Sequence, residues 1–476
     1  MSIIPNNKFY SRQQGSGHNN VFNFTKLIKC DSKIFMRYWL CLVLLLAIIE
    51  PSPPLYAQKP TVPSPGQPQS KPLLLTGGTA HIGNGTVIPV SVIRIENGKI
   101  TMVADMTTIR INPEGATVLD ISGKHVYPGL IATNTSIGLI EIGAVRATND
   151  RGEVGDLNPD VRALIGYNTD SHVIPTVRSN GILLAQIVPA GGFLSGLSSV
   201  VQLDAWNWED AAYQKDNGLY MTWPATMQYN WEEGRLKPNE KYSEQYQSLL
   251  QLFSEAKAYC SETAHMPQNL KLEAMCGLFN KTAKLYVQAN STKEISEAVN
   301  FAKQYGVAPV IVGGYDAWQV SDLLKENNVP VVLQRTHQLP HREDEDVYLP
   351  SRLPKMLKDA GVLFAITVGD GWDGFWDQRN LPFEAGTAAC FGLSKEEALQ
   401  AITLSPAKIM GIADKTGSIE TGKDANLIVS KGDVLDMAGN YIEQAFIQGR
   451  MVDLDNKQKA LYRKFMQKYQ LTPKQE

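Results

Sequence analysis

Two short polar side chains follow an apolar run, and their spacing could bring both to one binding site. The run at 126–131 contains a Pro-Gly pair and leads to Asn134 and Ser136. An apolar run with this punctuation is typical of a buried strand. Because residues two apart point to the same face of a strand, we expect Asn134 and Ser136 to point together. They can hydrogen-bond a substrate or a water there, or they can simply close the strand end.

A carboxylate and an imidazole follow two later strand-like runs. Asp370 comes soon after the apolar run at 362–368, with Asp373 as the alternative carboxylate. A lone carboxylate at a strand end can serve as a general base, although it can equally turn the loop. His337 follows the run at 330–334 and is the imidazole nearest to a strand end. We therefore expect Asp370 to act in catalysis and His337 to contact a substrate.

The overall composition excludes some classes of function. The chain has 476 residues and a formal net charge of −3, so it lacks the basic footprint of a nucleic-acid-binding protein. Its length suffices for two or more domains. No P-loop, G-x-S-x-G elbow or C-x-x-C pair occurs in the sequence. We expect a small-molecule substrate or ligand and no nucleic acid as partner, and a homo-oligomer stays open.

The first 57 residues indicate an export signal. Positive residues precede a charge-free apolar run from Tyr38 to Ile49. The run is followed by Leu55-Tyr56-Ala57, which ends in the small residue typical of a cleavage site. These are the parts of a secretory signal peptide, so we expect cleavage after Ala57 and a mature protein in the periplasm or cell envelope. The true start can be Met1 or Met36. An uncleaved membrane anchor is the alternative, but the run is short for a bilayer span, so we expect no stable span after cleavage.

Changes of composition along the chain predict a linker, two structural domains and a tail. Prolines recur in residues 58–72, which is typical of an extended linker. Residues 73–123 and 413–455 hold short strand-like runs separated by Gly and Asn turns. Residues 124–412 alternate strand and helix signals, which fits a (β/α)8 barrel or a doubly wound open sheet. Residues 456–476 are expected to form a tail helix that packs one aromatic stripe.

One segment, about 204–270, interrupts this alternation. It is rich in aromatic residues and contains a helical pattern from Asn239 to Cys260. We expect an insertion that either covers the mouth of a barrel or forms an aromatic packing layer. Cys260 and Cys276 could form a bridge in an oxidising compartment, but two buried free thiols are the simpler expectation.

Two strand motifs resemble those of the amidohydrolase superfamily. The family's first barrel strand has the pattern P-G-L/F-I-D-x-H-x-H, in which two histidines hold a catalytic metal. This chain matches it from Pro128 to Ile131, and Asn134 and Ser136 then stand at the two histidine positions. A later family motif, V-x-V-H-A, resembles the run that ends Val287-Gln288-Ala289. Gln288 therefore stands where the family has its next histidine.

Two further strings extend the resemblance toward the C-terminus. Residues 417–429 resemble the family's G-S-I/L-E-x-G-K-x-A-D-L-V, and the string from Arg379 to Gly386 resembles an exported, imidazolonepropionase-like subgroup. The resemblance implies an α/β fold that consists of a (β/α)8 TIM-like barrel and a composite β-sandwich. Residues 73–123 and 413–455, from the two ends of the mature chain, would build the sandwich.

The resemblance also implies hydrolysis of C–N bonds, in cyclic amides or small peptides, by a metal-activated water and an aspartate that moves the proton. Asp370 stands in that place, but amides and a hydroxyl occupy the histidine positions, and they are poor zinc ligands. We therefore expect no cofactor, and a divalent metal such as Zn only in a rearranged site. One hypothesis is a hydrolase with a rearranged or metal-poor site, and the alternative is a catalytically inactive binding protein in the cell envelope. The residues expected to hold substrate are Asn134, Ser136, Gln288, His337 and Arg379.

Overall fold

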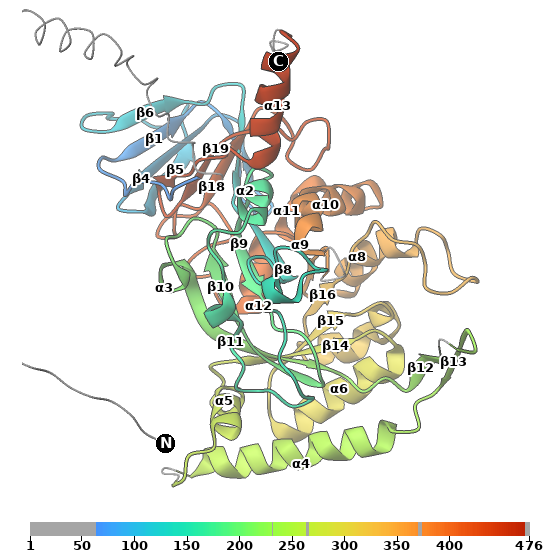
Figure 1. Ribbon diagram of the computed structural model, residues 1–476. Helices are drawn as coiled ribbons and strands as arrows, with labels where there is room; N and C mark the ends of the chain where they lie inside the picture. Colours follow the sequence, from blue (N-terminus) through green and yellow to red (C-terminus); the bar gives the residue numbers. More distant parts are fainter. Residues whose placement is uncertain (1–62, 231, 263–265, 370–373, 472–476) are drawn as a thin grey trace, which may run out of the picture. The chain divides into compact units, whose positions relative to one another are not determined.

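Eight strands lie side by side in the centre of the described chain, which comprises residues 63–230, 232–262, 266–369 and 374–471 of this computed structural model. Their order along the sheet is β17-β16-β15-β14-β11-β10-β9-β8 (Figure 1). The strands are β8 (Leu130–Thr135), β9 (Ile182–Ile187), β10 (Leu194–Gln202), β11 (Ala212–Thr222), β14 (Lys284–Ala289), β15 (Pro309–Gly313), β16 (Val331–Leu333) and β17 (Phe364–Ile366). β9 and β10 are buried along their whole length, as expected for strands covered on both faces.

The two ends of this strand order approach each other, so the sheet is nearly closed. Thr367, just after β17, donates its hydroxyl to the carbonyl oxygen of Thr133 in β8. Residues 401–402 bridge the remaining gap, because their carbonyl oxygens accept 3.0 Å hydrogen bonds from Ile366 N and Ile131 N. The prediction of a TIM-like barrel is confirmed.

The barrel departs from strict β/α alternation at one strand. β10 runs antiparallel to both β9 and β11, whereas the other neighbouring pairs in this sheet are parallel. Between β10 and β11 the chain forms only the four-residue α3 (Trp208–Ala211). The predicted insertion at 204–270 is therefore wrong in one respect, since it contains β11, a barrel strand.

Helices cover the outside of the sheet, and two of them begin at capping boxes. Ser291 and Glu294 form a capping box at the start of α6, and Ser394 and Glu397 form another at α11. Each box satisfies backbone N–H groups that the first helical turn leaves without partners. The helices are α2 (Val173–Arg178), α6 (Thr292–Tyr305), α7 (Ser321–Glu326), α8 (Leu349–Ala360), α9 (Gly374–Asp377), α10 (Leu381–Cys390), α11 (Lys395–Gln400) and α12 (Leu404–Met410).

The aromatic residues of the segment after β11 form a packing layer against the barrel helices. This segment contains β12 (Met227–Asn230), β13 (Arg235–Pro238), α4 (Tyr242–Ser261) and α5 (Leu270–Phe279). Phe253 of α4 meets Phe301 of α6 edge to face at 4.7 Å, and Trp223 meets the same ring at 5.4 Å. All three side chains are buried, so these rings enlarge the core.

A disulfide ties the two helices of this segment together. Cys260 in α4 and Cys276 in α5 are bonded, with their Cα atoms 5.3 Å apart. The expectation of two free thiols is therefore wrong. Helix α4 packs against α5, which brings the ends of the two helices together and makes the bond geometrically accessible.

Loss of this disulfide is expected to reduce stability measurably. Replacing Cys276 with serine opens a loop closed across 16 residues, and a loop of this length contributes about 3 kcal/mol in the chain-entropy model. The midpoint of urea denaturation should fall accordingly. Cys390→Ser is the matched control, because Cys390 is a free and exposed cysteine. Equal midpoints for the two variants would contradict the expectation.

A second region combines strands from both ends of the described chain into two sheets. The first sheet has the order β5-β4-β1-β6 and the second β20-β19-β18-β7-β2-β3. The strands are β1 (Leu73–Thr76), β2 (Thr79–His81), β3 (Val87–Ile88), β4 (Ser91–Glu96), β5 (Lys99–Asp105), β6 (Thr117–Asp120), β7 (His125–Pro128), β18 (Leu427–Ser430), β19 (Ile442–Ile447) and β20 (Arg450–Met451). β18 pairs with β7, so distant segments share one core, which includes buried Ile93, Val126 and Phe446.

The described chain ends in helix α13 (Lys457–Lys468), as the tail pattern predicted. Asn456 caps its start by accepting a hydrogen bond from Lys459 N. None of the residues in α13 is buried, so the expected packing of an aromatic stripe is wrong. None of the described helices has the length and apolar character needed to cross a membrane. The predicted signal segment lies outside the described residues.

Candidate functional site

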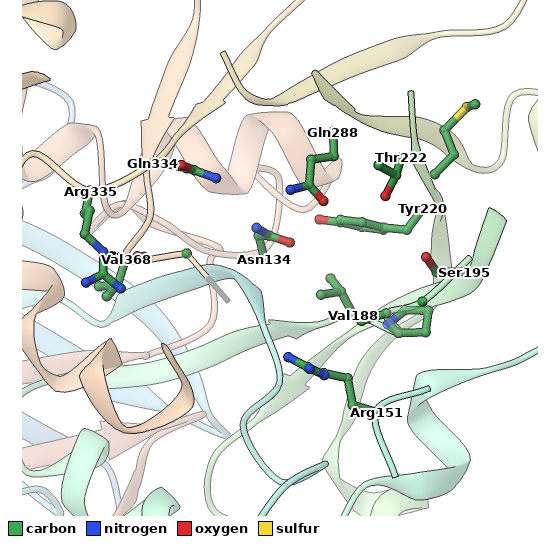
Figure 2. Close-up of a pocket in the computed structure, with 15 residues that line it drawn as sticks. Asn134, Arg151, Val188, Ser195, Tyr220, Thr222, Gln288, Gln334, Arg335 and Val368 are labelled. Carbon is green, nitrogen blue, oxygen red and sulfur yellow. Dashed lines mark hydrogen bonds between the residues drawn. The ribbon is translucent and has the colours of Figure 1, made fainter. Parts of the chain in front are cut away.

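A cavity of about 450 Å³ opens at the end of the barrel where most strands finish. Asn134 of β8, Thr222 of β11 and Gln288 of β14 line it together with residues just beyond β9, β16 and β17. Figure 2 shows these side chains converging on one space from separate strands. Active sites of this barrel class lie at the same end, because the loops there meet around one axis.

Asn134 and Gln288, two of the predicted substrate contacts, face the same cavity. Gln288 is held in register by β11, where it pairs with Thr222, and its carbonyl oxygen accepts a 3.0 Å hydrogen bond from Trp223 N. Asn134 has a φ of 51°, a left-handed conformation that asparagine adopts more readily than most residues. Neither side-chain amide is hydrogen-bonded to another described residue, so both can bind a ligand.

Tyr220 contributes an aromatic wall that the sequence interpretation did not identify. Its hydroxyl donates to Gln186 Oε1 at 3.0 Å, and its ring stacks on Tyr286 with the centroids 4.7 Å apart. Burial raises the pKa of the Tyr286 hydroxyl, so this group stays neutral beneath the cavity. Tyr220 belongs to the aromatic-rich segment of the sequence, but nothing in that pattern separates a wall residue from a packing residue.

Arg335 is a second cavity residue that the sequence interpretation missed. It comes two residues after β16, and its Nε donates a 3.0 Å hydrogen bond to the carbonyl oxygen of Val368. Its Nη2 atom lies 3.8 Å from Asp377 Oδ2, at the outer limit of an ion pair. Arg335 follows directly after the predicted strand at 330–334. This position at a strand end could have identified it as a cavity residue.

Ser136 and His337 do not line the cavity. Ser136 is fully buried, two residues beyond Asn134. His337 turns toward α10, where its Nε2 lies 2.5 Å from Thr387 Oγ1 and its Nδ1 lies 3.4 Å from Glu384 Oε1. Ser136 and His337 were expected to contact the substrate, but the structure places both outside the cavity lining.

Arg379 is exposed and lies away from the cavity. Its carbonyl oxygen accepts a 2.8 Å hydrogen bond from Asn180, which lies two residues before the start of β9. The start of β9 and the cavity are at opposite ends of that strand, because residues just after the end of β9 line the cavity. The structure thus does not place Arg379 with the other predicted contacts. Asp370 and Asp373 lie outside the described residues; Asp370 directly follows Gly369 in the sequence, and Gly369 lines the cavity.

Glu384 fixes the segment that carries Arg335. This carboxylate is only 3% exposed and accepts hydrogen bonds from Thr336 N at 2.6 Å, Thr336 Oγ1 at 2.8 Å and His337 N at 2.9 Å. Three donors on one carboxylate hold the backbone directly after Arg335 in place. The sequence string around 379–386 contains Glu384, but its charge alone did not distinguish a buried anchor from a surface residue.

The described cavity residues do not fit a zinc site. Their polar groups are side-chain amides, hydroxyls and the guanidinium groups of Arg151 and Arg335. Zinc in proteins is held by imidazole, thiolate or carboxylate, and guanidinium groups repel a cation. Across the parts of the chain that the structure describes, no three or more His, Cys, Asp or Glu side chains are grouped to hold a metal ion.

Comparisons with known proteins agree with the barrel fold. The amidohydrolase family model matches residues 235–452. The chain is 20% identical over 411 residues to amidohydrolase tasK of Hapsidospora irregularis, covering 78% of this chain and 40% of that protein. It is 30% identical over 192 residues to an imidazolonepropionase of Flavobacterium psychrophilum, covering 35% of this chain and 46% of that enzyme. The chain thus spans less than half the length of these curated relatives.

A solved structure extends the likeness along nearly the whole fold. The amidohydrolase from Thermotoga maritima MSB8 superposes with a TM-score of 0.68 at 24% sequence identity, covering 80% of this chain and 99% of that one. This likeness concerns the fold, which unites the nearly closed barrel with the two-sheet region. The predicted resemblance to the amidohydrolase superfamily is confirmed by the family model, which matches residues 235–452.

Proposed function

We propose that this chain hydrolyses a C–N bond in a small amide bound in the barrel cavity, with a rearranged site that does not depend on the family's histidine ligands. One observation carries the proposal. Asn134 and Gln288, which stand at two of the family's metal-ligand positions, line one cavity with Gly369, the neighbour of Asp370. The positions that serve chemistry in the family therefore meet here, although their side chains have changed.

The chemistry we propose uses groups of this chain alone. Asp370 takes a proton from a water whose oxygen adds to the amide carbon, and the C–N bond breaks as that proton passes to the leaving nitrogen. Amide N–H groups of Asn134 and Gln288 stabilise the negative charge that develops on the carbonyl oxygen. Tyr220 supplies a flat wall against which a small ring or amide plane can lie.

A second candidate function is ligand binding without turnover. The observation that favours it is the donor set, because no carboxylate or imidazole lines the cavity among the described residues. An unassisted water has a pKa near 16, whereas a catalytic zinc lowers it to about 7. A cavity lined by side-chain amides would then bind a ligand without hydrolysing it.

We also propose that the protein acts outside the cytoplasm. The predicted signal segment with cleavage after Ala57 supports this location. The Cys260–Cys276 bond supports it independently, because disulfides persist mainly in oxidising compartments.

The test combines metal content with turnover, using the chain from residue 58 purified without chelator or affinity tag. We expect less than one transition metal per chain and release of amine from a panel of cyclic amides and N-acyl amino acids. Asp370→Asn should lower that turnover at least about 100-fold, the usual size of a general-base contribution, while the melting temperature stays unchanged. Absence of turnover across the panel would overturn hydrolysis and favour the binding protein. A stoichiometric metal would overturn the metal-poor site.

A further inference from the structure

We propose that the cavity selects ligands with an anionic group, and that Arg335 recognises that group. The inference rests on the proposed function only in taking this cavity as the substrate site. It adds a substrate class, small carboxylates, and a specificity residue outside the family motifs described above.

A backbone hydrogen bond orients the Arg335 guanidinium at the cavity wall. Nε is engaged by the carbonyl oxygen of Val368 at 3.0 Å, which fixes the plane of the group. The side chain is 32% exposed at the cavity wall, so its outer edge remains accessible. A fixed guanidinium plane presents two parallel N–H groups, the geometry that matches a carboxylate.

Arg335 has only a distant carboxylate partner among the described residues. Its Nη2 atom is 3.8 Å from Asp377. By contrast, Arg178 contacts Asp204 at 2.7 Å, and Arg342 contacts Asp316 at 2.7 and 3.2 Å. Those two guanidinium groups are satisfied by close carboxylates, whereas Arg335 can form a closer pair with a ligand.

The wall around Arg335 is rich in hydrogen-bond donors. No described lining residue carries a negative charge. The side-chain amides of Asn134, Gln288 and Gln334 add N–H donors, and none of the three is hydrogen-bonded to another described side chain. Arg335 and these N–H donors favour a ligand rich in acceptor oxygens, and a carboxylate provides them.

Size limits the ligand further. A cavity of about 450 Å³ accommodates a small molecule and excludes a folded partner. The ligand class is therefore a compact acid with a second polar group, such as an N-acyl amino acid. Its carboxylate would meet Arg335, and its amide would reach Asn134 and Gln288.

The experiment measures binding by calorimetry, with the twenty N-acetyl amino acids and their C-terminal primary amides as matched probes. The host is the Asp370→Asn protein, so turnover does not interfere. We expect at least one acid to bind 10-fold or more tightly than its own amide. Arg335→Gln should remove that preference, Arg335→Lys should restore part of it, and Arg463→Gln, on the exposed face of α13, should leave it unchanged.

Three results would overturn the proposal: no acid binds, acids and amides bind equally, or Arg335→Gln retains the preference with an unchanged melting temperature. If Arg335→Gln fails to fold, the acid-to-amide ratio of Arg335→Lys decides instead, because this variant keeps the charge and loses the two-pronged geometry. Selective binding of acids without turnover by the Asp370-containing protein would refute hydrolysis and leave this inference intact.

Discussion

Replacing Arg178 with methionine is expected to lower the free energy of unfolding by about 3–5 kcal/mol. Arg178 is 3% exposed and pairs at 2.7 Å with Asp204, whose side chain is fully buried. Burial lowers the pKa of Arg178, and the neighbouring Asp204 opposes that effect. Without Arg178 the buried carboxylate keeps a 2.9 Å hydrogen bond from Gly66 N and a longer 3.4 Å contact to Arg450. The more distant Arg450 offsets the lost charge only in part, and the carbonyl oxygens of Leu203 and Asp453 also lose their donor, so the cost is large.

Urea denaturation followed by tryptophan fluorescence measures this effect. Arg352→Met is the control, because Arg352 pairs with Asp346 where both side chains are about half exposed, and such surface pairs contribute only about 0–1 kcal/mol. If both variants lost the same free energy of unfolding, burial of the Arg178–Asp204 pair would not explain its contribution to stability. The Nη2 atom of Arg178 also donates to the Asp453 carbonyl at 2.8 Å, so the variant tests the junction between the barrel and the C-terminal strands.

Replacing Glu384 with alanine is expected to impair both stability and ligand binding. Three donors from Thr336 and His337 would lose their buried acceptor, and each orphaned buried group costs about 1–3 kcal/mol. The segment that carries Arg335 would then move, and the preference for carboxylates over their amides should fall about 10-fold or more. Urea denaturation and the matched-probe calorimetry measure the two effects.

Glu384→Gln separates positioning from simple destabilisation. A glutamine oxygen can still accept from the backbone N–H groups of Thr336 and His337, so this variant should recover most of the acid-to-amide ratio. A purely structural role would lower the melting temperature of Glu384→Ala and leave that ratio untouched. Such a result would remove Glu384 from the recognition of the ligand.

The start of a helix can be recognised in the sequence where the signal acts within one turn. The capping boxes at Ser291 and Ser394 are of this kind, since their hydrogen bonds join residues three apart. The position of β11 was missed because its first half is polar and only partly buried. Its Gly218 fits for a tertiary reason, because a Cβ there would lie 2.3 Å from the ring of Tyr286. Close packing of this kind produces no hydrophobic periodicity from which the strand could be predicted.

The candidate site was predicted in part, and the backbone explains where the prediction failed. Asn134 and Gln288 were located by motif position, and both line the cavity. Ser136 was expected to point with Asn134, but the left-handed φ of 51° at Asn134 breaks the strand alternation on which that argument relied. Tyr220 and Arg335 were missed because their roles depend on which strands become neighbours.

The reversed strand β10 determines how this cavity can change during evolution. Because β10 runs back from the mouth, β9 and β10 join there through a short hairpin, and residues 188–191 of that turn form one wall. Gly191, with a φ of 102°, and the hydrogen bond from Ala190 N to the Arg151 carbonyl fix its path. Residues 188–190 carry small apolar side chains and Gly191 has a left-handed φ, so this wall offers a ligand no polar side chain. New specificities would arise instead from the opposite rim, after β16 and β17, where side chains face the ligand.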